Sequence, residues 1–432
     1  MRRKLETELV AWAKNPKRKP LLLNGARQVG KSYLLDWLGE HYYENYVHIN
    51  LETSVSINEY FKGDIIPLKV IQFIEASTGQ RVKPGKTLII LDEIQSSERA
   101  LMSLKAFCEE APQYAIAAAG SLLGVAINRE RYSFPVGKVD EMRLFPLDFE
   151  EFLWATGKEI LAGQIRESYL RMDAMPEPSH QLALECYKQY LIVGGMPAAI
   201  NSFVESDSLL TPTIQQSFIL NEYVADMAKY APPATTVKIR ACYNSIPMQL
   251  AKENKKFQYK VVKKGGSAFL FGESIDWLIQ AGIVLKCDKI DNAYMPIAAY
   301  VDMSDFKLYL ADAGLLTMKS GMARQTILSP VEADNTFMGG LVENYVAQSF
   351  AASGLPLFYW KNDNTAEVDF VLQIADQIIP VEVKKGMRTK SVSMNIFMDR
   401  YEADFGIRIS QKNFGYANRV KSVPLYAVFC VR

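Results

Sequence analysis

Residues 25–32 have the types and the spacing that suit the binding of a triphosphate. The segment Gly25-Ala26-Arg27-Gln28-Val29-Gly30-Lys31-Ser32 fits the pattern G-x-x-x-x-G-K-[ST] of a phosphate-binding loop. Glycines in such a loop let backbone N–H groups turn toward phosphate oxygens. The ammonium group of Lys31 can reach the β- and γ-phosphates, and the Ser32 hydroxyl can bind Mg²⁺. The pattern therefore predicts a nucleotide site whose cofactor-binding residues are Gly25, Ala26, Arg27, Gln28, Val29, Gly30, Lys31 and Ser32.

Two acids follow an apolar run further along the chain. Leu88-Ile89-Ile90-Leu91 is typical of a buried strand, and it ends in Asp92 and Glu93. Because ligands bind at the carboxyl ends of parallel strands, we expect these acids beside the loop. Asp92 would hold Mg²⁺ through water, and Glu93 would orient or deprotonate the attacking water. A solvated turn at the end of a strand is the alternative, but the two motifs together predict ATP as the ligand.

The segments around these motifs predict a parallel α/β sheet. Candidate strands lie at residues 21–23, 46–50, 87–91 and 114–118, and a helix over 32–38 is expected to end at Gly39. This alternation favours a P-loop ATPase core over residues 1–155. Ser121 follows the last of these strands, where it would either sense the γ-phosphate or cap a helix.

Composition limits the remaining possibilities. The chain has 432 residues, of which 49% are hydrophobic and 22% charged, and its net charge is +1. Such a length predicts about three domains, and such a charge requires that any nucleic-acid surface be local. Five scattered cysteines and three histidines indicate neither a zinc site nor a disulfide framework, which fits a cytoplasmic protein. No apolar stretch approaches the length of about 18 residues that a membrane span needs, so we expect no membrane partner.

The middle of the chain favours helices followed by a hairpin. Residues 156–235 are predicted to be helical, and residues 236–318 to form a winged-helix-like domain with strands at 283–286 and 293–298. A group of lysines precedes its third helix, with Phe257 and Tyr259 among them. It either binds nucleic acid, with DNA favoured over RNA, or forms a solvated helix face with two core aromatics. These lysines are Lys252, Lys255, Lys256, Lys260, Lys263 and Lys264.

Four residues in the predicted C-terminal domain, 319–432, suggest a second site. Glu343 lies in a helical stretch, Asp369 in a predicted strand over 367–371, and Glu382 and Lys384 in a strand over 380–384. Alternation of side chains places Asp369, Glu382 and Lys384 on one side of a hairpin. Glu343, Asp369 and Glu382 would bind a divalent metal, and Lys384 would activate water for attack on a phosphodiester, as in the PD-(D/E)XK nuclease fold. A charged, exposed strand face is the alternative.

The order of these motifs resembles that of the prokaryotic AAA-like ATPases that carry a C-terminal DUF4143 region. The resemblance implies ATPase activity, a winged-helix-like middle and a restriction-endonuclease-like C-terminal domain, all in one α/β chain. It extends over nearly the whole length. The segments that carry it are residues 25–32, 91–95, 145–152, 194–197, 312–316, 343–346, 367–370 and 381–384.

The chain departs from the family pattern at two places. Ala119-Gly120-Ser121 stands where the family usually has Thr-Gly-Ser, so that only Ser121 is left to sense phosphate. Gly137-Lys138 stands where the family often has Gly-Arg, which leaves the arginine finger unassigned. Arg129, Arg131 and Arg143 are substitutes that the sequence does not rank.

Three functions therefore remain open. In the first, an ATPase uses its nucleotide state to control how the C-terminal half engages nucleic acid. In the second, a Mg²⁺-dependent nuclease is licensed by ATP. In the third, a signalling ATPase carries an inert nuclease-like domain that binds protein. In each case Lys31 and Glu93 are the catalytic residues for ATP hydrolysis, and the sequence leaves open whether the protein forms a homo-oligomer.

Overall fold

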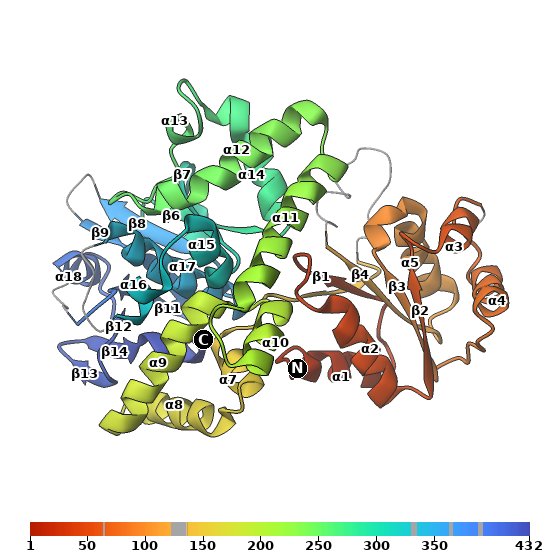
Figure 1. Ribbon diagram of the computed structural model, residues 1–432, viewed down its shortest axis with the longest axis horizontal. Helices are drawn as coiled ribbons and strands as arrows, with labels where there is room; N and C mark the ends of the chain where they lie inside the picture. The colour runs from red at the N-terminus through yellow and green to blue at the C-terminus, as the bar shows by residue number, and fades with distance from the viewer. Residues whose placement is uncertain (64, 122–134, 136, 330–334, 363–365, 388–391) are drawn as a thin grey trace. The chain divides into compact units, whose positions relative to one another are not determined.

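The computed structural model describes residues 1–63, 65–121, 135, 137–329, 335–362, 366–387 and 392–432. The chain divides into two compact units, which we describe separately (Figure 1). The smaller unit contains Arg2–Phe145 together with Gln280–Gly282, and the larger contains Pro146–Ile279 and Ile283–Arg432. Within the described ranges, no helix is both long and apolar enough to cross a membrane.

The smaller unit is built on a five-stranded parallel sheet. Its strands follow the order β2-β3-β4-β1-β5, and every neighbouring pair is parallel. All residues of β3 and β4 are buried, as expected for central strands covered on both faces. The prediction of a parallel α/β core is therefore confirmed. The strands are β1 (Leu21–Asn24), β2 (Asn45–Asn50), β3 (Thr87–Asp92), β4 (Ala115–Gly120) and β5 (Asp140–Arg143).

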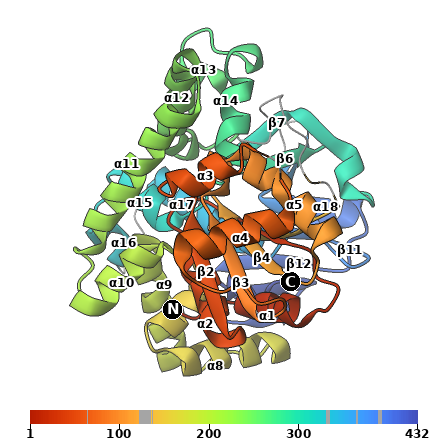
Figure 2. The same cartoon turned by 90° about the vertical axis from the view of Figure 1, so that its right-hand side faces the viewer.

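Helices cover both faces of this sheet. The first two lie on one face and the next three on the other (Figures 1 and 2). The expected end of the second helix at Gly39 is wrong, because that helix continues to Tyr42. Gly39 is instead needed for packing, since a Cβ there would lie 2.6 Å from Cγ of Tyr46. The helices are α1 (Glu6–Lys14), α2 (Lys31–Tyr42), α3 (Val55–Tyr60), α4 (Pro67–Thr78) and α5 (Glu98–Glu110), with a 3-10 turn η1 (Ile94–Ser96).

The larger unit begins with a run of helices, as predicted for residues 156–235. Four of them start with proline in the first turn, where its missing N–H is harmless. The run contains α7 (Phe149–Ala155), α8 (Glu159–Arg171), α9 (Glu177–Val193), α10 (Pro197–Ser206), α11 (Pro212–Tyr230), α12 (Pro233–Leu250), α13 (Tyr259–Val262) and α14 (Ala268–Gln280). Two short helices, α15 (Ala313–Ser320) and α16 (Arg324–Leu328), come later in the chain, after two strands.

A four-stranded sheet follows, in the order β7-β6-β8-β9. β6 (Val284–Ile290) and β7 (Val301–Leu310) are antiparallel, and β8 (Phe358–Asn362) and β9 (Ala366–Val368) extend the sheet. The predicted second strand at 293–298 is wrong, because Pro296 has no N–H to pair and a 3-10 turn, η2 (Ile297–Tyr300), precedes β7. The sheet joins strands from both sides of the predicted boundary at residue 318. The winged-helix assignment remains a prediction.

A second five-stranded sheet completes the larger unit, in the order β10-β11-β12-β14-β13. The predicted strand over 367–371 is wrong, because the chain leaves one sheet at Val368 and enters the other at Phe370, with Asp369 between them. The predicted antiparallel pairing is confirmed, since Phe370 lies opposite Val381. The elements are β10 (Phe370–Ile374), β11 (Gln377–Val383), β12 (Gly406–Ser410), β13 (Gly415–Ala417), β14 (Val420–Pro424), α17 (Thr336–Ala352), α18 (Val392–Arg400) and η3 (Leu425–Cys430).

Three of the sequence motifs meet inside the larger unit. The N–H of Leu147 donates to the carbonyl of Gly195 at 2.8 Å, and the N–H of Gly195 donates to Oδ2 of Asp312 at 2.6 Å. A Cβ at Gly195 would lie 2.1 Å from the Leu147 carbonyl oxygen, so only glycine fits there. Asp312 also caps α15 by accepting from the N–H of Leu315 at 2.8 Å. These contacts therefore hold the turn after α9 against the start of α15.

Candidate active site

The loop between β1 and α2 has the backbone that phosphate binding requires. A Cβ at Gly25 would lie 2.3 Å from the carbonyl oxygen of Leu144. The backbone adopts positive φ at Gln28 (67°) and at Gly30 (94°), which is the N-cap of α2. The loop thus turns back on itself and leads directly into the N-terminus of a twelve-residue helix. Such an N-terminus presents free N–H groups and favours anions.

Lys31 is buried at this loop, with 8% of its surface exposed. Its Nζ donates to the carbonyl oxygens of Gly25 at 2.9 Å and Ala26 at 2.8 Å. These bonds hold the ammonium group over the loop. A phosphate oxygen entering the loop would therefore meet a positioned charge, as predicted for this residue.

Ser32 and Asp92 lie together although they are far apart in the sequence. The Ser32 hydroxyl donates to Oδ2 of Asp92 at 2.6 Å, and the N–H of Glu93 donates to Oδ1 at 2.9 Å. A hydroxyl and a carboxylate at one point are the oxygen ligands that Mg²⁺ prefers. This donor set fits the magnesium ion that a phosphate-binding loop implies.

His48 and Asp36 extend the hydrogen bonds around Asp92, and the sequence did not predict their part in the site. Nδ1 of His48 lies 2.6 Å from Oδ1 of Asp36, and Nε2 lies 3.3 Å from Oδ2 of Asp92. The hydrogen bond to Asp36, with that to Asp92, raises the pKa of His48 to about 9. Burial alone would raise the pKa of Asp92, but hydrogen bonds from His48, Ser32 and the Glu93 N–H outweigh it and lower that pKa. Asp92 is therefore held as a carboxylate.

Glu93 is linked to the predicted sensor through Gln95. The Gln95 amide Nε2 donates to Oε2 of Glu93 and lies 3.4 Å from Oγ of Ser121. Gln95 is 8% exposed, and its Oε1 has no hydrogen-bond partner in the described part of the chain. The sequence placed Gln95 in the motif 91–95 without giving it a role. Its spacing of two residues from Glu93 was the only available signal.

Of the substitute arginines, only one can be located. Arg129 and Arg131 lie outside the described residues. Arg143 ends β5, and its Cα is paired with that of Asn24, the residue before the loop. Its guanidinium carbon lies 4.9 Å from the ring centroid of Phe145. A role for Arg143 as the arginine finger stays a prediction.

In the larger unit, Glu343 is buried in a cluster of donors. Its Oε2 accepts from Nζ of Lys255 at 2.5 Å. Its Oε1 accepts from Nζ of Lys307 at 3.1 Å and from the hydroxyl of Tyr309 at 2.5 Å. Burial would raise the pKa of Glu343, but the two lysines outweigh this effect and lower it to about 2. Glu343 is therefore a paired carboxylate.

Asp369, between β9 and β10, and Glu382, on β11, belong to the same predicted site as Glu343. Oδ2 of Asp369 accepts from the N–H of Val383 at 2.8 Å, and burial followed by the charge of Glu343 raises the pKa of Asp369 to about 6. Oε1 of Glu382 pairs with Nζ of Lys384 at 2.5 Å. The other oxygen of Glu382 is buried and has no partner among the described residues.

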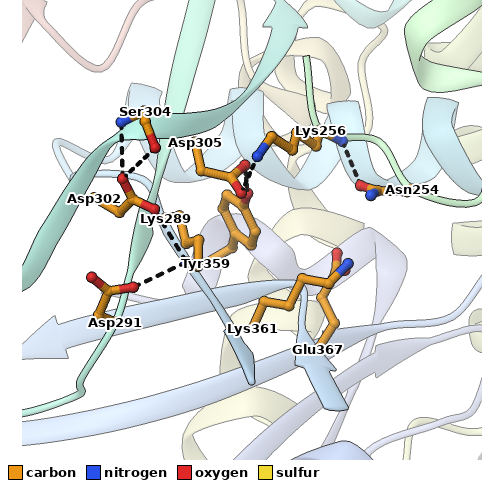
Figure 3. A network of polar contacts seen from close by, with 10 residues as sticks. All are labelled: Asn254, Lys256, Lys289, Asp291, Asp302, Ser304, Asp305, Tyr359, Lys361 and Glu367. Atoms are coloured by element: carbon orange, nitrogen blue, oxygen red, sulfur yellow. Dashed lines mark hydrogen bonds and ion pairs between the residues drawn. The ribbon is translucent and has the colours of Figure 1, made fainter. Parts of the chain in front are cut away.

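Further ion pairs extend outward from the cluster (Figure 3). Glu367 accepts from Lys307 at 2.8 Å and from Lys361 at 3.1 Å. Asp305 accepts from Lys256 and from the Tyr359 hydroxyl, both at 2.5 Å. Across the ranges that the structure describes, no three His, Cys, Asp or Glu side chains form a group able to hold a metal. The predicted ligands Glu343, Asp369 and Glu382 are thus not gathered as one metal site.

The lysine group before α14 divides into two kinds. Lys255 and Lys256 form ion pairs, Lys255 with the buried Glu343 and the more exposed Lys256 with Asp305. Lys260, Lys263 and Lys264 are exposed. Phe257 is buried and stacks on Phe306 at a centroid distance of 5.5 Å, so this part of the group is core.

Solved structures resemble the chain only distantly. The Walker-type ATPase PABY2304 of Pyrococcus abyssi is 14% identical, with a TM-score of 0.43 over 74% of this chain and 95% of its own. ORC2 of Aeropyrum pernix, in ADPNP–ADP complexes, is 12% identical, with a TM-score of 0.40 over 76% of this chain and 92% of its own. AMPPCP-bound DnaA of Aquifex aeolicus is 10% identical, with a TM-score of 0.29 over 63% of this chain and 86% of its own. No curated protein matches the chain.

Three families match parts of the sequence. Residues 184–326 match a domain of unknown function, DUF8612. Residues 17–153 match the family described as AAA domain, and residues 338–428 match the domain of unknown function DUF4143. The latter two are the families that the motifs predicted. The chain therefore joins an AAA domain of the P-loop type to a C-terminal DUF4143 domain.

Proposed function

We propose that this protein hydrolyses ATP at the loop of residues 25–32 and that the nucleotide state controls nucleic-acid engagement by the larger unit. The observation that carries the first part is the meeting of Ser32 and Asp92, whose side chains lie 2.6 Å apart beside the buried ammonium of Lys31. A phosphate grip, a pair of magnesium ligands and an adjacent acid are what phosphoryl transfer needs.

Each residue of the site has a separate task. Lys31 places positive charge where the transferring phosphoryl group becomes more negative. Ser32 and Asp92 hold the magnesium ion, which neutralises phosphate charge when bound. Glu93 orients the attacking water or accepts its proton, and Gln95 fixes the Glu93 carboxylate through its amide.

The exposed lysines support the second part of the proposal. Lys260, Lys263 and Lys264 lie close together in the sequence on the surface of the larger unit. Where surface lysines neutralise the phosphates of a nucleic acid, they do so without regard to its base sequence and release the counterions bound to it. DNA is the ligand we favour.

Replacement of Lys31 tests ATP hydrolysis. Because Lys31→Ala removes charge stabilisation from the transition state, we expect turnover to fall by roughly 10²–10³-fold. Phosphate release from ATP with magnesium is the measurement. Lys62→Ala is the matched control, since Lys62 is exposed and forms an ion pair with Glu59 at 2.5 Å. Turnover near the wild-type rate in Lys31→Ala would show that the site is misassigned.

A further inference from the structure

The cluster around Glu343 already contains the positive charge that a metal would supply. Both oxygens of Glu343 accept from ammonium groups, Oε2 from Lys255 at 2.5 Å and Oε1 from Lys307 at 3.1 Å. Tyr309 adds a third donor at 2.5 Å. A magnesium ion binds carboxylate oxygens that face it with free lone pairs. Both oxygens of Glu343 are instead turned toward protein donors.

The charges in the cluster balance without a metal. Three carboxylates, those of Glu343, Glu367 and Asp369, lie within the field of the three ammonium groups of Lys255, Lys307 and Lys361. Lys307 is 1% exposed and Glu343 is 2% exposed. Buried charges persist only when they are paired. Here Glu343 and Glu367 form ion pairs, and Asp369 accepts from the N–H of Val383 within the field of Lys255 and Lys307. A divalent cation would add two positive charges to a group that is already neutral.

The two lysines come from different parts of the larger unit. Lys307 lies within strand β7 and is part of the buried core. Lys255 lies in the connection between α12 and α13, and 17% of its side chain is exposed. Lys256 follows it but pairs with Asp305 on the surface side (Figure 3). The connection between α12 and α13 therefore places Lys255 in the buried cluster and Lys256 at its more exposed edge.

We propose that Lys255 and Lys307 take the place of a divalent cation in this cluster, so that the DUF4143 domain keeps its carboxylates together without a metal. The donor set does not fit the magnesium ion that a PD-(D/E)XK nuclease site implies. The C-terminal domain then contributes to binding and not to phosphodiester cleavage. Removing Lys255 frees Oε2 of Glu343, whose charge already acts on Asp369, and leaves a buried carboxylate that can bind a cation.

Binding of Mn²⁺ to the full-length chain tests this substitution of ammonium for metal. All variants carry Asp92→Asn, which removes the carboxylate that we assign to magnesium in the nucleotide site, and no nucleotide is added. We expect no saturable Mn²⁺ binding by the Asp92→Asn chain in electron paramagnetic resonance titrations. Adding Lys255→Ala should produce saturable binding. Its affinity for Mn²⁺ should exceed that of the Asp92→Asn chain by at least about tenfold, because a positive charge at contact distance from Glu343 is gone.

Two further variants make the result specific. Lys256→Ala is the matched control, because it removes the neighbouring lysine without freeing Glu343, and it should not bind Mn²⁺. Glu343→Gln added to Lys255→Ala should abolish the new binding. Circular dichroism on each variant confirms that it is folded.

Two results would overturn the proposal. The first is saturable Mn²⁺ binding by the Asp92→Asn chain that Asp369→Asn or Glu343→Gln removes. The second is a folded Lys255→Ala chain that still binds no Mn²⁺. Neither depends on ATP hydrolysis, so failure of this inference is distinguishable from failure of the proposed ATPase function.

Discussion

At the scale of single residues, the nucleotide site depends on side chains that position others. Asp92 is the clearest example, because Ser32, His48 and the Glu93 N–H all donate to its carboxylate. Glu93 has a comparable partner in Gln95. The backbone of Glu93 also adopts a positive φ of 51°, a conformation that is uncommon for residues other than glycine. Glu93 is thus held at its N–H by Asp92 and at its carboxylate by Gln95.

Replacement of Gln95 should lower the rate of ATP hydrolysis without weakening ATP binding. Gln95→Leu keeps the volume but removes the amide that holds Glu93 and contacts Ser121. We expect kcat for ATP hydrolysis to fall about tenfold while the dissociation constant for ATP stays unchanged, because the lost contact orients water and not nucleotide. Steady-state kinetics and a binding titration measure the two quantities.

Ser96→Ala is the control for Gln95→Leu. The Ser96 hydroxyl donates to the carbonyl of Glu93 at 2.8 Å, so this variant alters the same turn without touching the carboxylate. An equal loss of kcat in both variants would mean that the turn matters as a whole and that Gln95 has no special role.

At the scale of elements, some residues of the sequence motifs are buried polar groups that link one helix or strand to another. Asn344 of α17 accepts from the N–H of Leu310 at 2.7 Å and donates to its carbonyl at 2.9 Å, which ties the helix to the end of β7. Asp312 links the turn after α9 to the start of α15. Buried polar groups are expensive when unpaired, so these residues fix the packing of the elements that carry them.

Asp312 predicts a pH dependence of stability. Burial raises its pKa from 3.8 to about 6, against the backbone N–H groups that lower it. The folded state therefore holds the proton more tightly than the unfolded state. The stabilisation is complete below about pH 4 and is lost as pH rises to about 6, a change of roughly 3 kcal/mol. Urea unfolding should show a loss of stability between pH 4 and 6 that is smaller by this amount in Asp312→Asn than in the wild type, while Asp369 contributes a similar loss to both chains.

Asp302→Asn is the control for that experiment. Hydrogen bonds from Ser304 lower the pKa of Asp302 to about 2, so its titration lies below the range between pH 4 and 6. Its stability curve should stay parallel to that of wild type there. Parallel curves for Asp312→Asn as well would contradict the assignment of a raised pKa to Asp312.

At the scale of the whole molecule, the proposal joins ATP use in one unit to nucleic-acid binding in the other. The division of the lysines matters for this link, because only exposed ones are available to phosphates. Lys263 and Lys264 are exposed, whereas Lys256 is paired with Asp305. We therefore expect replacement of Lys263 and Lys264 to weaken DNA binding and replacement of Lys256 to leave it unchanged, although the three lie close in sequence.

DNA binding at several salt concentrations, with and without ATP, measures this link. Each phosphate contact contributes about 0.9 to the slope of log K against log salt for duplex DNA. The double variant Lys263→Ala and Lys264→Ala should reduce the slope by about 2, whereas Lys256→Ala should leave it unchanged. Affinity should also differ between the ATP-bound and free states. Binding that is insensitive to salt in both states would refute nucleic-acid engagement.

The sequence by itself determined the nucleotide loop, the acids after β3 and the parallel core. Residues 25–32 and Asp92 follow local rules, since loop chemistry and buried strands leave a signal within a few neighbouring positions. The same rules placed the antiparallel pairing of β10 with β11, because alternation fixes which side chains share a face.

Only the tertiary structure decided which partners these residues have. Gln95 and His48 became part of the site through contacts across the sheet, and Lys255 reaches Glu343 over 88 positions of sequence. The break at Asp369 likewise depends on two sheets that recruit strands from distant segments. A local pattern specifies the types of side chain present, but the distance between two charges depends on the path of the whole chain. That distance decides whether Glu343 meets a metal ion or a lysine.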